Sequence, residues 1–453
     1  MRKRIATHAL LGILLLSATA SAQRSVYDTS DDLRRVPIPP VDRSRIPALV
    51  IRGATLLDGY GKAPVPDSVI VMRGDRIVAA GPAASTTVPS DVARTIDAKG
   101  QWVMPGMIDV HCHLTSQRGT NIGGYPDSDA AAAIRGTQIA QSVVRAGITA
   151  IRDPATTGDV SIRLKEAVAR GLITGPRIFW AGAMIASTGG HGDEATSTAT
   201  GRWKPNVPNT RTYTANGPWE WRQAVREQIR RQVDWIKTSA PFTKEEITAA
   251  IDEAHREGLR VAIDSFGEYT NWAIEAGVDS VEHTLDMPDD EVALMAKHKT
   301  AFNPTIVAFE TLLTRGYPTA GIVPGAFYYT FSRRYPLDLQ DNLKHVGEAY
   351  RAGVRIGVGT DIAFETEILV PDAYFRELNF LQQAGMPVKA VLASATRVGA
   401  DILGMSDKLG TIEAGKIADV IVLGSDPEAD LKNLRDLRYV VAGGKVVVDG
   451  PAK

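Results

Sequence analysis

The feature that most constrains the fold of this 453-residue sequence is a regular alternation of short apolar segments with amphipathic helical segments. The helical segments, such as 161–171, 219–233, 244–258 and 339–353, place apolar residues at positions i, i+3 and i+4. Such segments separate most of eight candidate strands: Met107–Cys112, Thr149–Arg152, Arg177–Ala181, Asp234–Thr238, Arg260–Ser265, Ser280–Glu282, Ala301–Thr305 and Arg355–Gly359. Alternating strands and helices are typical of α/β folds with parallel strands. Eight units over roughly 300 residues predict a (β/α)₈ TIM barrel rather than an open sheet.

The two ends of the sequence show a different pattern, with short alternating strands joined by turns. This pattern covers residues 48–101 and returns after residue 409. We expect both ends to assemble one composite β-sandwich domain beside the barrel. The predicted domains are a signal peptide (1–22), a linker or extended N-terminal segment (23–46), the N-terminal segment of the β-sandwich (47–105), the barrel (106–408) and the C-terminal segment of the β-sandwich (409–453).

The first 22 residues have the three regions of a secretory signal peptide. Arg2, Lys3 and Arg4 precede an apolar run of 12 residues, and small residues follow up to Ala22. A membrane-spanning helix needs about 20 apolar residues, so the run is too short to serve as an anchor. We expect export, cleavage after Ala22, and a periplasmic or secreted protein that has no membrane partner.

The charge balance bears on the kind of partner. The sequence contains 51 basic and 52 acidic residues, a formal net charge of -1. Such a chain has no basic field to hold nucleic acid. No Gly-rich nucleotide-binding motif follows any candidate strand either. We therefore expect a small-molecule substrate and no nucleic-acid partner, and assembly into a homo-oligomer stays open.

Ionisable residues recur where the candidate strands end, which is where barrel enzymes carry their catalytic groups. The first strand ends in His111-Cys112-His113. Side chains alternate along a strand, so both imidazoles point to one face and can share a metal ion. An isolated pair of this kind is more often structural, but His283 and Asp361 stand at corresponding strand ends. Imidazole and carboxylate groups together suit zinc or another divalent metal.

Six segments, as a set and in this order, resemble the amidohydrolase superfamily. They resemble most its imidazolonepropionase-like and prolidase-like (Xaa-Pro dipeptidase-like) branch, which includes exported dipeptidases. The segments are GMIDVHCHL, GPRIFWAGAMIASTGGHGD, VDWIKTSA, AGVDSVEH, AGVRIGVGTD and LGTIEAGKIADVIVL. The resemblance runs from about Val50 to the C-terminus. It implies a (β/α)₈ barrel with a composite β-sandwich and a metal-dependent hydrolase that acts on carbon–nitrogen bonds.

The resemblance also implies roles for single residues. His111 and His113 match the ligands of the more buried metal, and His283 matches the ligand on the sixth strand. Lys237 matches a lysine that becomes carboxylated and bridges two metals, although it could instead be an ammonium paired with a carboxylate. Asp361 matches the residue that contacts the metal and acts as general base. It would take a proton from a water activated by the metal and pass it to the leaving amine. The expected cofactor is Zn²⁺, one or two ions per chain.

One position departs from the family pattern. The fifth strand ends in Asp264, where the family typically has a histidine ligand. Three outcomes stay open. Asp264 ligates the metal itself, because a carboxylate oxygen also binds zinc; the second metal site is weak and the enzyme uses one ion; or the site has decayed and the protein only binds its ligand.

Two further residues are candidates for contact with the substrate. His191 could polarise a carbonyl or stabilise an oxyanion, or it could cap backbone groups of its loop. Arg152 could hold a substrate carboxylate as a bidentate fork, or form an internal salt bridge with its neighbour Asp153.

The sequence therefore predicts an exported zinc-type hydrolase of a dipeptide or an N-acyl amino acid. Two alternatives remain. The same site could hydrolyse a lactone, an ester or a phosphotriester, or the chain could be a non-catalytic binding protein with a degenerate metal site.

Overall fold

The computed structural model describes residues 42–115, 128–156, 158–191, 212–283, 286–314, 326–330, 333–336, 338–361 and 371–450. The expected signal peptide and residues 23–41 of the expected linker lie outside these ranges. The described end of the linker holds one 3₁₀ turn, Arg43–Arg45. Among the described residues, no helix combines the length and the apolar character needed to cross a membrane.

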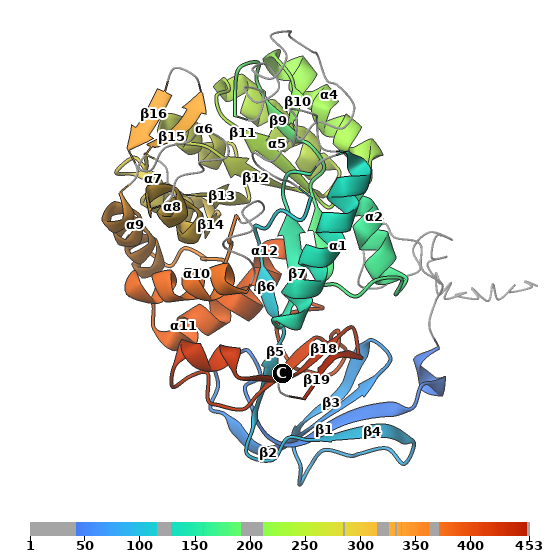
Figure 1. Ribbon diagram of the computed structural model, residues 1–453. Coiled ribbons are helices and arrows are strands. Elements are labelled where there is room, and N and C mark those ends of the chain that lie inside the picture. Colours follow the sequence, from blue (N-terminus) through green and yellow to red (C-terminus); the bar gives the residue numbers. More distant parts are fainter. Residues whose placement is uncertain are drawn as a thin grey trace, which may run out of the picture.

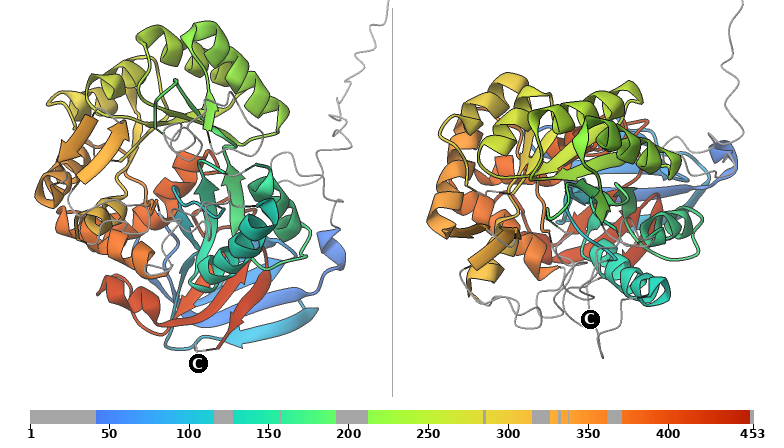
Figure 2. Two further views of the ribbon diagram at one scale, coloured as in Figure 1. Left: turned by 45° about the horizontal axis from the view of Figure 1, so that its top comes forward. Right: turned by 90° about the horizontal axis from the view of Figure 1, so that it is seen from above.

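One eight-stranded sheet combines strands from both ends of the chain (Figure 1). Its strands are β1 (Ala48–Leu56), β2 (Val65–Arg73), β3 (Arg76–Pro82), β4 (Val92–Asp97), β5 (Trp102–Pro105), β17 (Val420–Leu423), β18 (Leu437–Ala442) and β19 (Lys445–Asp449). The C-terminal strand β17 pairs antiparallel with β5, and β5 pairs with β1. Figure 2 shows the C-terminal strands in red beside the N-terminal strands in blue. Strand pairing thus joins the two β-rich ends into one sheet.

The middle of the chain supplies parallel strands in two sheets. The first contains β6 (Met107–Asp109), β7 (Ile148–Asp153) and β8 (Arg177–Trp180). The second contains β9 (Met184–Ala186), β10 (Thr212–Thr214), β11 (Trp235–Ser239), β12 (Arg260–Asp264), β13 (Ser280–Glu282) and β14 (Ala301–Asn303). A separate hairpin pairs β15 (Ala326–Thr330) with β16 (Arg333–Pro336).

Backbone hydrogen bonds connect the three-stranded sheet and the six-stranded sheet at both of their edges. The N–H of Asp234 donates to the carbonyl of Trp180, at 2.8 Å, and thereby links β11 to β8. On the other side, Phe302 of β14 bridges to Ile356. The N–H of Val110, just after β6, in turn donates to the carbonyl of Val358 at 2.8 Å. Segment 355–358 therefore lies between β14 and the end of β6.

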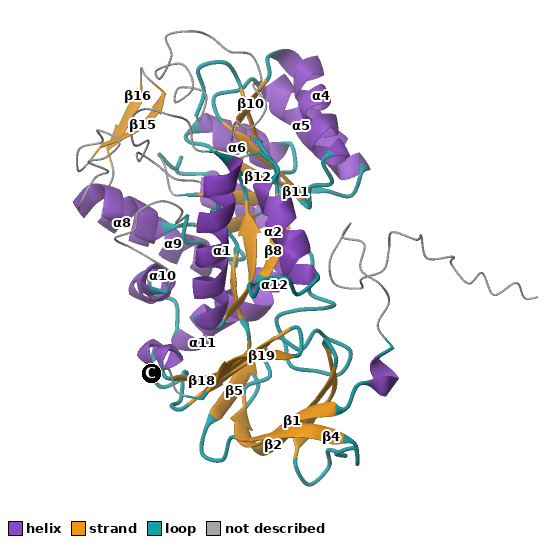
Figure 3. Cartoon of the chain, turned by 45° about the vertical axis from the view of Figure 1, so that its right-hand side comes forward, coloured by secondary structure: helices purple, strands orange, loops and turns teal. Residues whose placement is uncertain are grey.

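Helices surround the parallel strands at one end of the molecule, and the eight-stranded sheet lies at the other end (Figure 3). They are α1 (Asp129–Arg145), α2 (Val160–Ala169), α4 (Gly217–Arg230), α5 (Lys244–Arg256), α6 (Glu268–Glu275), α7 (Glu291–His298), α8 (Ile306–Thr314), α9 (Leu339–Arg351), α10 (Asp372–Gln383), α11 (Val388–Ala393), a π-helical turn (Ser394–Val398) and α12 (Gly399–Leu403). Local chemistry fixes several helix starts. At α5, Thr243 and Glu246 exchange hydrogen bonds in a capping box.

The α/β class is confirmed, and so are the helices expected at 161–171, 219–233, 244–258 and 339–353. Seven of the eight candidate strands coincide with strands of the structure within a few residues. The eighth, Arg355–Gly359, forms only the isolated bridge at Ile356. The parallel strands form sheets of three and six rather than one continuous eight-stranded sheet, and the β-rich ends form one sheet by strand pairing. A closed barrel and a two-layered sandwich therefore stay predictions.

A buried glutamate joins two of the helices. Glu377 of α10 is fully buried and accepts hydrogen bonds from the N–H groups of Ile306 and Val307 at the start of α8, at 3.1 and 2.8 Å. Burial raises the pKa of Glu377 to about 8, because these hydrogen bonds offset only a fraction of the cost of desolvation.

This raised pKa predicts a dependence of stability on pH. Between about pH 4.5 and pH 8 the folded protein holds a proton on Glu377 that the unfolded chain has released. The free energy of unfolding should therefore fall as pH rises through this window, by up to ~1.4 kcal/mol per pH unit from this group. Glu377→Gln should remove that contribution, as measured by urea denaturation across the window. The same pH dependence in both proteins would contradict the assignment.

Candidate metal centre

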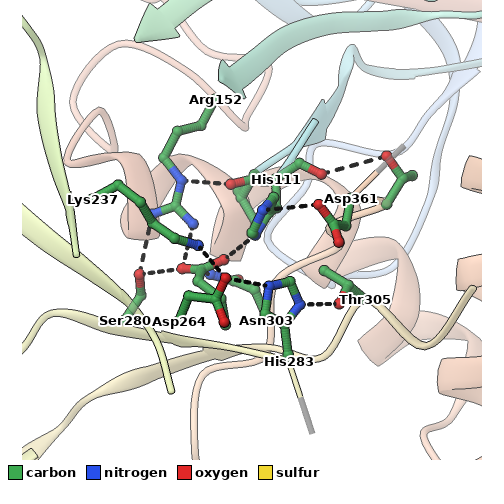
Figure 4. Close-up of polar contacts among 12 residues, drawn as sticks. His111, Arg152, Lys237, Asp264, Ser280, His283, Asn303, Thr305 and Asp361 are labelled. Carbon is green, nitrogen blue, oxygen red and sulfur yellow. Dashed lines mark hydrogen bonds and ion pairs between the residues drawn. The ribbon is translucent and has the colours of Figure 1, made fainter. Parts of the chain in front are cut away.

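The ionisable residues that the sequence places at strand ends meet in one place (Figure 4). His111 and His113 follow β6, His283 follows β13, and Asp361 follows the segment 355–358. All three histidines are buried, and Asp361 is partly exposed. The ends of β6 and β13 and the bridged segment 355–358 thus supply the groups, at the positions that the sequence predicts.

The His-x-His pair converges on one oxygen atom. The Nε2 atoms of His111 and His113 lie 3.3 and 3.1 Å from Oδ1 of Asp361. The Nδ1 atom of His113 lies 3.1 Å from the carbonyl oxygen of Ala155, and this carbonyl can only accept a hydrogen bond. The Nδ1 atom of His113 therefore carries a proton, and its Nε2 atom faces Asp361.

Among the described residues, His111, His283 and Asp361 offer ligand atoms that all lie within 4.8 Å of one another. Two imidazole nitrogens and a carboxylate oxygen form a donor set that suits zinc and other borderline divalent ions. His113 lies outside this triad but contacts its Asp361.

A second group of charges adjoins the triad. Oδ2 of Asp264 lies 3.5 Å from Nε2 of His283, 3.9 Å from Nζ of Lys237 and 3.8 Å from Nε2 of His191. Its other oxygen, Oδ1, is buried and has no hydrogen-bond partner among the described residues. A buried carboxylate oxygen without a donor is costly unless a cation approaches it. The residues present therefore fit a divalent cation beside Asp264 and the triad.

The electrostatics of the site favour the ionised carboxylates. Burial alone raises the pKa of Asp361, but hydrogen bonds from His111 and His113 outweigh it and hold the pKa well below its usual range. Burial also raises the pKa of Asp264, and the charges of His283 and Lys237 more than reverse this effect. Burial lowers the pKa of Lys237, although three nearby carboxylates oppose that shift.

Backbone strain marks two of the triad residues. His283 has φ 76° and Asp361 has φ 50°, in the left-handed region that residues other than glycine rarely adopt. Such conformations cost about 1–3 kcal/mol each and cluster at functional sites. They turn the chain at the end of each strand. No sequence signal marks them, because neither position is a glycine.

Arg152 does not lie where a guanidinium that binds a substrate carboxylate is expected. The residue is fully buried, and its guanidinium donates to the carbonyl of Val110 and to Glu282, both at 2.5 Å, and to Ser280 at 3.1 Å. The guanidinium carbon lies 4.5 Å from the centre of the Trp235 ring. This geometry corrects the expected role to an internal salt bridge. The bridge forms with Glu282 and not with the neighbouring Asp153.

His191 lies at the edge of the site. Its side chain is 15% exposed and faces Asp264, as described above. This position is compatible with contact to a substrate, and the alternative role as a cap within its own loop stays open.

Glu282 is the site residue whose role sequence reasoning missed. The sequence pattern marks it only as the neighbour of His283, yet its Oε2 atom lies 2.6 Å from Nδ1 of His111. A signal is present in the sequence, because Glu282 is an acidic residue at the end of a buried strand.

Comparison with known proteins indicates the family to which the chain belongs. An amidohydrolase family model matches residues 102–447. Ochratoxinase from Aspergillus niger is 27% identical over 454 residues, covering 92% of this chain and 90% of that protein. Imidazolonepropionase from Methylobacterium sp. (strain 4-46) is 28% identical over 411 residues, covering 84% of this chain and 93% of that protein.

Solved structures agree with these matches. A Xaa-Pro dipeptidase with methionine bound in its active site has a TM-score of 0.76 and 29% identity, and the match covers 88% of this chain and 99% of that one. A prolidase complexed with N-methylphosphonate-L-proline has a TM-score of 0.72 and 26% identity, covering 89% of this chain and all of that one. The family match and the convergent imidazole and carboxylate groups together show that the chain belongs to the amidohydrolase family, a family of metal-dependent hydrolases.

Proposed function

We propose that the protein is an exported, metal-dependent hydrolase that cleaves the carbon–nitrogen bond of a dipeptide or an N-acyl amino acid. The observation that carries this proposal is the compact triad of His111, His283 and Asp361, with His113 directed at the same Asp361 oxygen. The names of the structural relatives, a Xaa-Pro dipeptidase and a prolidase, support a small peptide-like substrate.

The donor set defines where a cation would be held. His111, His113, His283 and Asp361 would be the principal ligands, with Asp264 and Lys237 beside them. Zinc or another divalent metal bound there would act as a Lewis acid and lower the pKa of a water molecule to about 7. We take Asp264 to be a ligand, because its buried Oδ1 atom lacks a donor among the described residues.

Asp361 supplies the proton transfers. It is ionised, partly exposed, and already positioned by two imidazoles, so it can accept a proton from an attacking water. The same carboxyl group then donates that proton to the leaving nitrogen, which departs as an amine. His191, at the mouth of the site, is the candidate to contact the substrate carbonyl.

The remaining features of the proposal concern fold and location. The linking hydrogen bonds at Trp180 and Val358 support a closed (β/α)₈ barrel, and the shared eight-stranded sheet supports a composite β-domain. The N-terminal pattern of residues 1–22 supports export to the periplasm or the exterior, where the enzyme would meet small-molecule substrates. The proposal also includes carboxylation of Lys237 and the binding of one or two metal ions per chain.

Metal analysis combined with a substrate panel tests the proposal. The protein is purified with Zn²⁺ supplied, its metal content is measured by mass spectrometry, and hydrolysis is assayed on dipeptides, N-acyl amino acids, a lactone, an ester and a phosphotriester. We expect bound metal and turnover of a carbon–nitrogen substrate that a chelator abolishes and Zn²⁺ restores. Protein that binds no metal under these conditions, or that turns over only the oxygen esters, contradicts the proposal.

A further inference from the structure

The two oxygens of the Glu282 carboxylate have different partners. Oε1 accepts hydrogen bonds from Arg152 at 2.5 Å, Ser280 at 2.6 Å and Asn303 at 3.0 Å. Oε2 faces Nδ1 of His111 at 2.6 Å. The whole side chain is 0% exposed. One oxygen is thus held by three donors, while the other contacts a candidate metal ligand.

The fold places each of these partners around the carboxylate. Ser280 and Glu282 lie two residues apart on β13, so their side chains share one face of the strand. Asn303 is the register partner of Glu282 on the neighbouring strand β14. Arg152 reaches the same point from β7 and supplies a positive charge (Figure 4). This arrangement balances the buried negative charge and fixes the orientation of the carboxylate.

The chemistry of a carboxylate decides the protonation pattern of His111. An ionised carboxylate only accepts hydrogen bonds, so the short contact to Oε2 requires a proton on Nδ1 of His111. When His111 binds a metal it does so as neutral imidazole, and the other nitrogen, Nε2, then carries the lone pair. That nitrogen is the one that points at Asp361, 3.3 Å away.

We propose that Glu282 is a positioning residue that holds His111 in the Nδ1-protonated form required for a metal ligand, with Arg152, Ser280 and Asn303 holding Glu282 in turn. This inference rests on the proposed function, because it concerns the same metal centre. Carboxylates that orient ligating histidines typically change metal affinity by about 10- to 100-fold when they are replaced.

Glu282→Gln tests the proposal, because it keeps the shape of the side chain and can present an NH₂ group to His111. We expect Zn²⁺ affinity, measured by competition with a chromogenic chelator, to fall by about 10- to 100-fold. We also expect His111 to shift to the Nε2-protonated form. This form is read from ¹⁵N-histidine NMR spectra of the metal-depleted full chain, with His111→Gln to assign the signal.

Glu291→Gln is the matched control. Glu291 is also a buried glutamate, on α7, and the charges assigned as acting on it are those of Asp290 and Asp286, which are not among the metal-site residues named above. Glu291→Gln should leave Zn²⁺ affinity within about 2-fold and the protonated form of His111 unchanged, because Glu291 is not assigned a hydrogen bond to any candidate metal ligand. Unchanged affinity and unchanged protonation in Glu282→Gln overturn the proposal.

Glu282→Asp keeps the proposal testable if the glutamine variant does not fold. Its carboxylate can still only accept, so His111 must remain protonated on Nδ1; an Nε2-protonated His111 in this variant overturns the proposal. Both measurements are made without substrate. A protein that hydrolyses nothing in the panel can therefore still confirm the role of Glu282, and an active enzyme can still refute it.

Discussion

Replacing Asp361 by asparagine is expected to lower kcat by about 10²- to 10⁴-fold, the range typical for loss of a general acid–base group. Asparagine has nearly the same shape but cannot accept and return a proton. Both imidazoles that contact Oδ1 of Asp361 can still meet the amide oxygen, so the fold should persist. The measurement is kcat on the best substrate of the panel.

Metal content must be measured on the same preparation, since Asp361 is also a candidate ligand. Asp407→Asn serves as the matched control, because Asp407 is 69% exposed and pairs only with its neighbour Lys408 among the interactions assigned to it. The control should retain full activity. If Asp361→Asn holds a full complement of metal and keeps more than about a tenth of the wild-type kcat, Asp361 is not the general base.

The largest expected loss of stability comes from a buried ion pair that includes none of the candidate metal ligands. Nζ of Lys165, on α2, lies 2.7 Å from both carboxylate oxygens of Asp234, and each side chain is 1% exposed. Asp234 also accepts a hydrogen bond from the N–H of Trp180. Lys165→Met leaves this carboxylate buried without its cation, which should reduce the free energy of unfolding by about 3–5 kcal/mol.

A matched exposed pair provides the comparison. Lys244 and Glu275 are separated by 2.6 Å, but their side chains are 54% and 45% exposed. Lys244→Met should therefore cost less than about 1 kcal/mol in urea denaturation. Adding Asp234→Asn to Lys165→Met should recover some of the loss, because the buried charge is removed. If the two methionine substitutions reduce the free energy of unfolding equally, burial does not determine how much the Lys165–Asp234 pair contributes to stability.

Much of the fold follows from local patterns in the sequence. Periodicity of apolar residues locates four of the helices and seven strands, because each pattern reflects the face that an element buries. The same logic locates His111, His113, His283 and Asp361, since they end apolar strands. Segment 355–359 is harder to place, because its pairing consists of a single bridge and a few hydrogen bonds from distant strands.

The features of the site that could not be predicted depend on contacts between distant residues. Arg152 and Glu282 are 130 positions apart, so no spacing rule could pair them, and the adjacent Asp153 was the natural candidate. Strand alternation also predicts that Glu282 and His283 point in opposite directions. The left-handed backbone of His283 ends that alternation and allows both side chains to serve the site. Such a conformation reflects tertiary packing rather than local preference.

The pairing of β5 with β17 has a consequence for biosynthesis. Pro105 pairs with Val420, so about 300 residues, or roughly 15–60 s of translation, separate the two partners. Until the later strand is made, one edge of β5 exposes unpaired N–H and C=O groups, which invite association with other chains. Nascent chains that terminate before residue 420 should therefore depend on chaperones or proteases for their removal, whereas chains that include β17 close this edge by pairing it with β5.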